Sequence, residues 1–213
     1  MEIKTLNVGW NGTNCYIIYD IGSGEASVID PGGEAERIIA FINEKKLKVK
    51  NIFLTHGHFD HILGVQQLKE ATGARLVVHE ADAVCLRDTH AALYNSLMPE
   101  PFRVAKPDIL LKGGERTLVN GVEMLFVHTP GHSPGSMCLF MSNVLFSGDT
   151  LFADTIGRSD FPTSDPAALA ESLRNLYALN RDFVVYPGHG EPTSLFYEKE
   201  HNRDFRAWAA KRY

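Results

Sequence analysis

The segment Ile52-Phe53-Leu54-Thr55-His56-Gly57-His58-Phe59-Asp60-His61 places three histidines and an aspartate directly after an apolar run. Imidazole nitrogens and carboxylate oxygens are the ligands that zinc, iron and manganese take from proteins. Short histidine-rich segments also occur on protein surfaces without a function, and a polar surface loop is the simpler alternative. The segment therefore predicts a strand that ends in a candidate metal site.

The spacing of these side chains indicates how many metal ions they hold. On a strand, alternation would direct His61 to the opposite face from the other three. On a helix, His58 would be set apart from His56. A turn that enters a helix at about Asp60 would instead direct the first two histidines to one point, and Asp60 with His61 to a neighbouring point. This spacing favours two adjacent metal ions.

Two ions need further ligands, and three later segments share one pattern, in which an apolar run is followed by glycine and a histidine or aspartate. The candidates are His132 in Thr129-Pro130-Gly131-His132, Asp149 in Phe146-Ser147-Gly148-Asp149, and His189 in Tyr186-Pro187-Gly188-His189. A strand fixes the position of the residue after it, and glycine lets the backbone turn sharply beside a site. Each candidate alone has an ordinary explanation as a turn or cap residue. The recurrence of the pattern favours one shared site.

These motifs resemble the metallo-β-lactamase superfamily, whose signature is H-x-H-x-D-H followed by a later His, an Asp and a final His. The match covers nearly the whole chain, and all seven ligand positions hold the expected residue type. The resemblance implies a first metal ion on His56, His58 and His132, a second on Asp60, His61 and His189, and a bridge between the two ions by Asp149.

Within the superfamily, the local motifs are most similar to the glyoxalase II group, especially its short bacterial members. The similar segments are 55–61, 129–136, 147–152, 156–160 and 186–193. The resemblance implies hydrolysis of a hydroxyacylglutathione-type thioester such as lactoylglutathione. Full-length glyoxalase II has a C-terminal helical domain that holds glutathione, whereas only twenty residues follow Thr193 here. Glutathione specificity is therefore open.

Two adjacent metal ions would hold a bridging hydroxide that attacks a carbonyl at neutral pH. Asp149, by spacing the ions, and Asp60, by orienting the hydroxide, are the candidate catalytic residues. A thioester suits this chemistry because its leaving thiolate needs no proton. The expected cofactors are two divalent ions, zinc first, with iron or manganese as alternatives that the same ligands accept. Arg158 is a candidate to bind a substrate carboxylate, and an ion pair with Asp160 is the alternative.

Other functions fit the same ligands. A persulfide dioxygenase with one iron would leave Asp60, His61 and His189 without metal. Lactone or phosphodiester hydrolysis is a further alternative, and a non-catalytic metal-binding module is disfavoured by the complete ligand set. A secreted β-lactamase is disfavoured because Asp149 stands where such enzymes with two zinc ions usually place cysteine.

The order of the apolar segments permits two sheets with helices outside. The resemblance implies the same α/β (α+β) class, as a four-layer αββα sandwich of two facing mixed sheets with outer helices. Strands are predicted near 3–8, 15–19, 26–29, 52–54, 76–79, 117–119, 122–128, 137–141, 144–147 and 183–186, and helices at 34–45, 62–71, after Glu80, at 167–177 and at the C-terminus. Segment 88–107 is expected to be a loop over the site.

Composition and charge limit the classes of partner that we expect for this protein. A formal charge of −5 and the absence of basic clusters disfavour nucleic acid. The chain has no apolar segment long enough for a bilayer and no signal-peptide pattern, so we expect a cytoplasmic protein with a small-molecule substrate and no membrane partner. No linker-like segment divides the chain, which predicts one domain over residues 1–213. The three cysteines lack a C-x-x-C pair and are expected to be buried thiols. The oligomeric state stays open.

Overall fold

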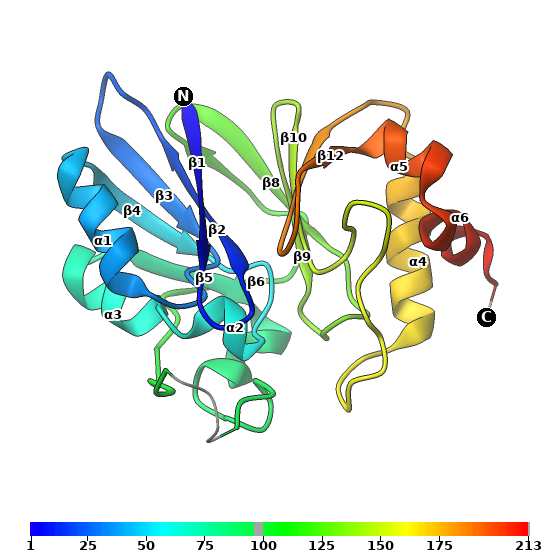
Figure 1. Cartoon of the computed structure of the whole chain (residues 1–213), viewed down its shortest axis with the longest axis horizontal. Coiled ribbons are helices and arrows are strands. Elements are labelled where there is room, and N and C mark those ends of the chain that lie inside the picture. The colour runs from blue at the N-terminus through cyan, green and yellow to red at the C-terminus, as the bar shows by residue number, and fades with distance from the viewer. Residues whose placement is uncertain (96–99, 213) are drawn as a thin grey trace.

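The computed structural model describes residues 1–95 and 100–212. Within these residues, two six-stranded sheets face each other, and helices cover their outer faces (Figure 1). The strand order is β1-β2-β3-β4-β5-β6 in the first sheet and β12-β11-β10-β9-β8-β7 in the second. The sandwich of two sheets with outer helices that the sequence predicts is confirmed.

The first sheet joins an antiparallel group to a parallel group. Its strands are β1 (Glu2–Val8), β2 (Thr13–Tyr19), β3 (Glu25–Ile29), β4 (Lys48–Phe53), β5 (Arg75–His79) and β6 (Ile109–Leu111). The pairs among β1, β2 and β3 are antiparallel, and the pairs from β3 to β6 are parallel. Helices α1 (Ala35–Glu44) and α3 (Val65–Thr72) connect the parallel strands and lie on the outer face (Figure 1).

The second sheet is also mixed. Its strands are β7 (Arg116–Val119), β8 (Val122–His128), β9 (Met137–Met141), β10 (Val144–Gly148), β11 (Val184–Pro187) and β12 (Thr193–Ser194). Strands β7 to β10 form an antiparallel meander, and β11 pairs parallel to β10. Helices α4 (Pro166–Tyr177), α5 (Leu195–His201) and α6 (Arg203–Ala210) lie on the outer side of this sheet (Figure 1).

Alternation along the strands divides the core into layers, because successive side chains of a strand point to opposite faces. On β2, Ile17 packs with the α1 and α3 side, whereas Ile18 faces the second sheet. Between the sheets, Phe53 of β4 meets Phe126 of β8 with ring centroids 5.2 Å apart. Both rings are almost completely buried. These inter-sheet contacts fix the two sheets relative to each other.

The structure corrects several predicted boundaries. The helix predicted at 62–71 is instead a short helix α2 (Phe59–Ile62) followed by α3, because the Gly64 amide donates to the Pro31 carbonyl outside the helix. The C-terminal helix is two helices, separated at Asn202, whose backbone is extended and whose side chain caps α6. Strands β6 and β12 were not predicted, since they have only three and two residues at sheet edges.

The segment 88–107 is partly described. The described residues on either side of 96–99 contain no helix or strand, in agreement with the predicted loop, and 96–99 lie outside the described residues. Cys15, Cys85 and Cys138 are buried and free of disulfides, as expected. In the described part of the chain, no helix combines the length and the apolar character needed to cross a membrane.

Replacing Phe126 with alanine is expected to lower the free energy of unfolding by about 3–5 kcal/mol, because it removes a buried ring between the sheets and leaves a cavity. Denaturation in urea, followed by circular dichroism, measures this change. Leu118→Ala on β7 is the control, since Leu118 is 70% exposed and its loss is expected to change the stability by under about 0.5 kcal/mol. Equal losses in the two variants would contradict the proposed inter-sheet core.

Candidate metal centre

The candidate ligands all follow the ends of central strands. The segment His56–His61 follows β4 and runs into α2, while His132, Asp149 and His189 follow β8, β10 and β11. The ends of these four strands meet at one edge of the sandwich, the lower edge in Figure 1, where α2 lies. The two sheets thus bring four separate loops of the chain together. The structure unites all seven side chains that the sequence singled out as ligands.

The first group consists of His56, His58 and His132. One ligand atom from each residue lies within 4.8 Å of those of the other two. His58 Nδ1 is 2.9 Å from His132 Nε2. His56 and His132 have perpendicular rings with centroids 4.8 Å apart. Three imidazoles that converge in this way match the number and type of protein ligands at a catalytic zinc site.

The second group consists of Asp60, His61 and His189, whose ligand atoms also lie within 4.8 Å of one another. The Nε2 atoms of the two histidines are 3.3 Å apart. His189 Nε2 is 3.3 Å from Asp60 Oδ2. This group differs from the first because it contains a carboxylate, which adds a negative charge.

Asp149 lies between the two groups. Its Oδ2 atom is 3.5 Å from His132 Nε2 in the first group and 3.6 Å from His189 Nε2 in the second. Its Oδ1 atom is 3.4 Å from His61 Nε2. One carboxylate therefore reaches ligand atoms of both groups, which is the arrangement a bridging ligand requires.

Unpaired buried atoms show that the groups fit metal ions. His56 Nε2 and Asp149 Oδ1 are buried and have no hydrogen-bond partner among the described residues. Leaving a buried polar atom unpaired costs about 1–3 kcal/mol, so such atoms in a folded protein need an explanation. Burial, with the neighbouring His132, lowers the pKa of His58 to about 3, and burial also holds the pKa of His56 well below its ordinary value. Both rings are therefore neutral at pH 7 and can offer lone pairs to a metal ion.

Asp30 supports the second group and was missed in the sequence analysis. Its Oδ2 atom lies 3.0 Å from His61 Nδ1 and also accepts a 2.6 Å hydrogen bond from the Thr55 hydroxyl. Its Oδ1 atom accepts the Thr55 amide. A hydrogen bond at Nδ1 fixes the ring and leaves Nε2 facing the site. Asp30 directly follows β3 and precedes Pro31-Gly32, so the pattern of a strand followed by a turn could have identified it.

Asn11 is a second residue that the sequence analysis did not identify. It lies in the turn between β1 and β2, and its Nδ2 atom donates to Asp60 Oδ2 at 2.8 Å. Burial alone would raise the pKa of Asp60, but His61, His189 and this amide lower it below its ordinary value, so the carboxylate is ionised. The turn sequence Asn11-Gly12 gives no indication of this contact, because it forms only when β2 is packed beside α2.

The ion pair considered for Arg158 is present. Its Nε and Nη2 atoms donate to the two carboxylate oxygens of Asp160, each at 2.9 Å. The guanidinium carbon also lies 4.5 Å from the centroid of the Phe161 ring. The side chain still lines the pocket over the candidate ligands, and the Arg158 carbonyl accepts a hydrogen bond from His132 Nδ1 at 2.9 Å. The loop that carries Arg158 therefore orients a candidate ligand through its backbone.

Five of the seven candidate ligands line a pocket of about 690 Å³, namely His58, Asp60, His132, Asp149 and His189. Its apolar lining consists of Trp10, Phe59, Leu93, Phe152, Ile156 and Phe161. Leu93 belongs to the segment that the sequence placed over the site. The pocket combines apolar walls with a base of polar side chains, as ligand sites commonly do.

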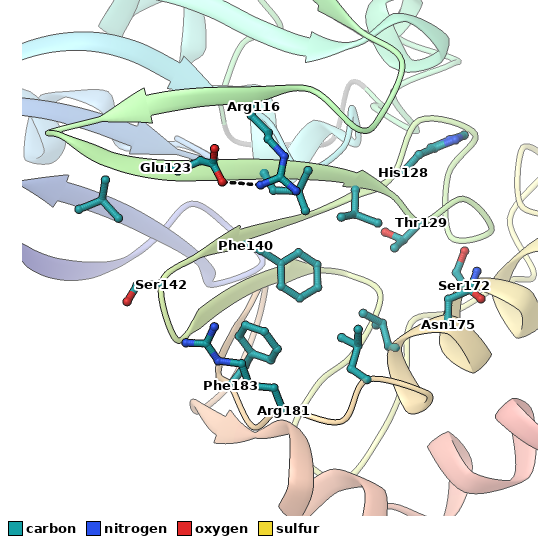
Figure 2. A pocket seen from close by; sticks show the side chains of 15 residues that line it. Arg116, Glu123, His128, Thr129, Phe140, Ser142, Ser172, Asn175, Arg181 and Phe183 are labelled. Atoms are coloured by element: carbon teal, nitrogen blue, oxygen red, sulfur yellow. Dashed lines mark hydrogen bonds and ion pairs between the residues drawn. The ribbon is translucent and has the colours of Figure 1, made fainter.

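A second hollow, of about 560 Å³, lies on the outer face of the second sheet beside α4 (Figure 2). None of the seven candidate ligands lines it. His128 lines this hollow and stacks on His79 with ring centroids 4.0 Å apart. Its Nε2 atom bonds to the Pro134 carbonyl. His128 is thus a packed residue at a strand end.

Comparisons with known proteins identify the family. The model of the metallo-β-lactamase superfamily matches residues 8–189. Hydroxyacylglutathione hydrolase GloC of Haemophilus influenzae is 36% identical over 214 residues, covering 95% of this chain and 97% of that protein. The chain belongs to the metallo-β-lactamase superfamily.

Solved structures agree with this assignment. The crystal structure of BLEG-1 B3 metallo-β-lactamase has a TM-score of 0.88 and 34% identity, covering 95% of this chain and 98% of that one. The structure of TTHA1623 in a di-iron-bound form has a TM-score of 0.78 and 33% identity, covering 94% of this chain and 98% of that one. The predicted αββα metallo-β-lactamase fold is confirmed.

The metal content of the purified chain tests the two groups. Wild-type protein is expected to bind about two ions per chain, because each group offers the ligands of one ion. His61→Ala is expected to lower this number to about one, since the second group loses a central ligand. Elemental analysis by mass spectrometry measures it, with His90→Ala, at an exposed residue, as the control. Two ions retained in His61→Ala would contradict the assignment of the second group.

Proposed function

We propose that the chain is a binuclear metal-dependent hydrolase that cleaves thioesters of the hydroxyacylglutathione type. The observation that carries this proposal is the position of Asp149 between two groups of three ligands at the base of an apolar pocket. The similarity to GloC, which is described as a hydroxyacylglutathione hydrolase, supports the substrate class.

Two divalent ions in these groups would polarise the substrate carbonyl and provide hydroxide at neutral pH. The residues of the chain have separate tasks in this reaction. Asp149 holds the two groups at a fixed spacing, and Asp60, held by Asn11, orients the nucleophile. The aromatic walls of the pocket limit the access of other water molecules.

The pocket favours a thioester over an amide. Among the described residues that line it, only the candidate ligands have side chains that could donate a proton near neutral pH, because the rest are apolar or are Asn11, Thr155 and Arg158. In amide hydrolysis the leaving amine must take up a proton, which a nearby side chain acting as a general acid supplies. A thiolate leaves without one. The lack of a separate acid among the lining residues therefore supports thioester hydrolysis.

We propose zinc as the first choice of metal, with iron or manganese as alternatives. The di-iron form of TTHA1623 supports iron as an alternative in a related chain. Iron also keeps the persulfide dioxygenase alternative open. Oxygen uptake with glutathione persulfide at iron saturation distinguishes the two, because the hydrolase consumes no oxygen. A panel of thioesters, lactones, phosphodiesters and a β-lactam, each with defined zinc, iron and manganese, tests the remaining alternatives.

Some features stay predictions from the sequence. These are the single domain over residues 1–213, the small-molecule substrate without nucleic-acid or membrane partners, and the cytoplasmic location.

Asp149→Ala is expected to abolish thioester hydrolysis, because it removes the carboxylate that joins the two groups. Steady-state hydrolysis of S-lactoylglutathione, followed by release of the thiol, measures the loss. Glu191→Gln, a change at an exposed carboxylate just after His189, is the control and is expected to retain wild-type activity. Activity of Asp149→Ala within about tenfold of wild type would contradict the proposed mechanism.

Arg158→Gln tests the substrate contact. If Arg158 binds a carboxylate on the thiol portion of the substrate, this change raises KM for S-lactoylglutathione by about tenfold and leaves kcat nearly unchanged, because uniform binding is lost. A lactoyl thioester of an uncharged thiol is the matched substrate, and its kinetics should not change. An equal effect on both substrates would show that Arg158 acts only through the shape of its loop.

A further inference from the structure

Asp82 is a fully buried carboxylate outside the set of candidate ligands. It lies in the 3₁₀ helix η1 (Glu80–Leu86), directly after β5, and is 0% exposed. Burying a carboxylate is costly unless hydrogen bonds replace its lost water. Three donors do so here. Gly57 N and Ser133 Oγ donate to Oδ2 at 2.9 and 2.6 Å, and Gly135 N donates to Oδ1 at 2.6 Å.

These donors belong to the two loops that carry the first group of ligands. Gly57 stands between His56 and His58, and Ser133 directly follows His132. The loops extend from different sheets, the first from β4 and the second from β8. A single side chain therefore holds the His56–His58 pair and His132 at a fixed separation.

The approach of both loops to η1 is as close as the backbone allows. A Cβ atom added at Gly135 would lie 2.7 Å from the Asp82 carboxylate. A Cβ atom added at Gly57 would lie 2.6 Å from Cys85 Cβ and 3.0 Å from the Asp82 carbonyl oxygen. Neither loop has room to shift toward η1, and the three hydrogen bonds oppose movement away from it.

The second group of ligands is held by different residues. Asp30 contacts His61, and Asn11 contacts Asp60. The described hydrogen bonds of the Asp82 side chain go to Gly57, between two first-group ligands, and to Ser133 and Gly135, beside the third. None of them goes to Asp60, His61 or His189. A change at Asp82 is therefore expected to act more strongly on the first metal ion than on the second.

We propose that Asp82 is a positioning residue for the first metal site, where it sets the distance between the His56–His58 pair and His132. The inference rests on the metal centre of the proposed function and not on its substrate. Residues that orient ligands through hydrogen bonds without binding the metal affect metal affinity by about 10- to 100-fold when replaced.

The test measures each site alone in the full-length chain. The His61→Ala variant keeps only the first site, and the His132→Ala variant keeps only the second. Asp82→Asn is then added to each variant, and the asparagine side chain has nearly the same shape as the aspartate. It replaces one carboxylate oxygen, which accepts hydrogen bonds, with an NH2 group, which would face the donor groups of the two loops. Zinc affinity of the metal-free proteins is measured by competition with a chromophoric chelator. We expect a loss of about 10- to 100-fold in the His61→Ala background and a change of under about twofold in the His132→Ala background.

Two further variants separate positioning from general destabilisation. Leu68→Ala removes a buried side chain of α3 that is neither a candidate ligand nor a hydrogen-bond partner of Asp82, and it is expected to lower stability without changing zinc affinity in the His61→Ala background. Ser133→Ala removes one donor and keeps the carboxylate, so a smaller loss confined to the first site is expected. If Asp82→Asn does not fold, Ser133→Ala decides the question.

Each outcome bears on the proposal. Equal losses at both sites, or a loss in Leu68→Ala as large as that in Asp82→Asn, would overturn the positioning role. Unchanged affinity of the first site in Asp82→Asn, or in Ser133→Ala where that variant decides, would also overturn it. A wild-type chain that binds two zinc ions but cleaves no thioester would contradict only the proposed function, whereas one that binds no zinc would contradict both.

Discussion

The apolar contact between the two sheets is the constraint on which the rest of the structure depends. Phe53 and Phe126 take part in this contact, one on each sheet. His56 follows Phe53 by three residues, and His132 follows Phe126 by six. Since the strands hold these loops at their ends, the distance between the sheets sets the distance between the ligands. Burial of apolar area, which is not directional, thereby positions a site that needs defined geometry.

Buried polar groups then refine what the apolar core places approximately. Asp30 fixes the His61 ring, Asn11 holds Asp60, and the Arg158 carbonyl orients His132. Each contact joins segments far apart in the sequence, and each satisfies a group that would otherwise be costly to bury. The same contacts leave the ligand atoms of the histidines facing the two groups. The same hydrogen bonds therefore stabilise the fold and position the ligands of the metal centre.

The C-terminal part of the chain has a related role. Glu198 of α5 is fully buried and accepts hydrogen bonds from the Asp154 amide and from Asn202, which in turn donates to the Thr155 carbonyl. The loop that contains Asp154 and Thr155 continues into Arg158 and forms one wall of the pocket. The two short helices therefore tether the wall of the site.

The sequence by itself determined the class of site and most of the fold. Histidine, aspartate and glycine after apolar runs identified all seven candidate ligands, because strand ends and turn residues are local features that single-sequence patterns report. The resemblance carried by these motifs supplied the sandwich. The pattern could not show where α2 and α3 divide or that β6 and β12 exist, since the break depends on Pro31 and the short strands depend on their neighbours.

Only the tertiary structure decided what holds the ligands in place. That Asn11 and Asp30 orient second-group ligands, and how closely Asp149 approaches both groups, follow from distances across the fold. Asp82 shows most clearly why such contacts could not be predicted from the sequence. In the sequence it is one acidic residue at the start of a short helix, with no motif around it. Its position between two metal-binding loops arises because β4 and β8 lie in opposite sheets, and a local pattern carries no information about which strand ends meet.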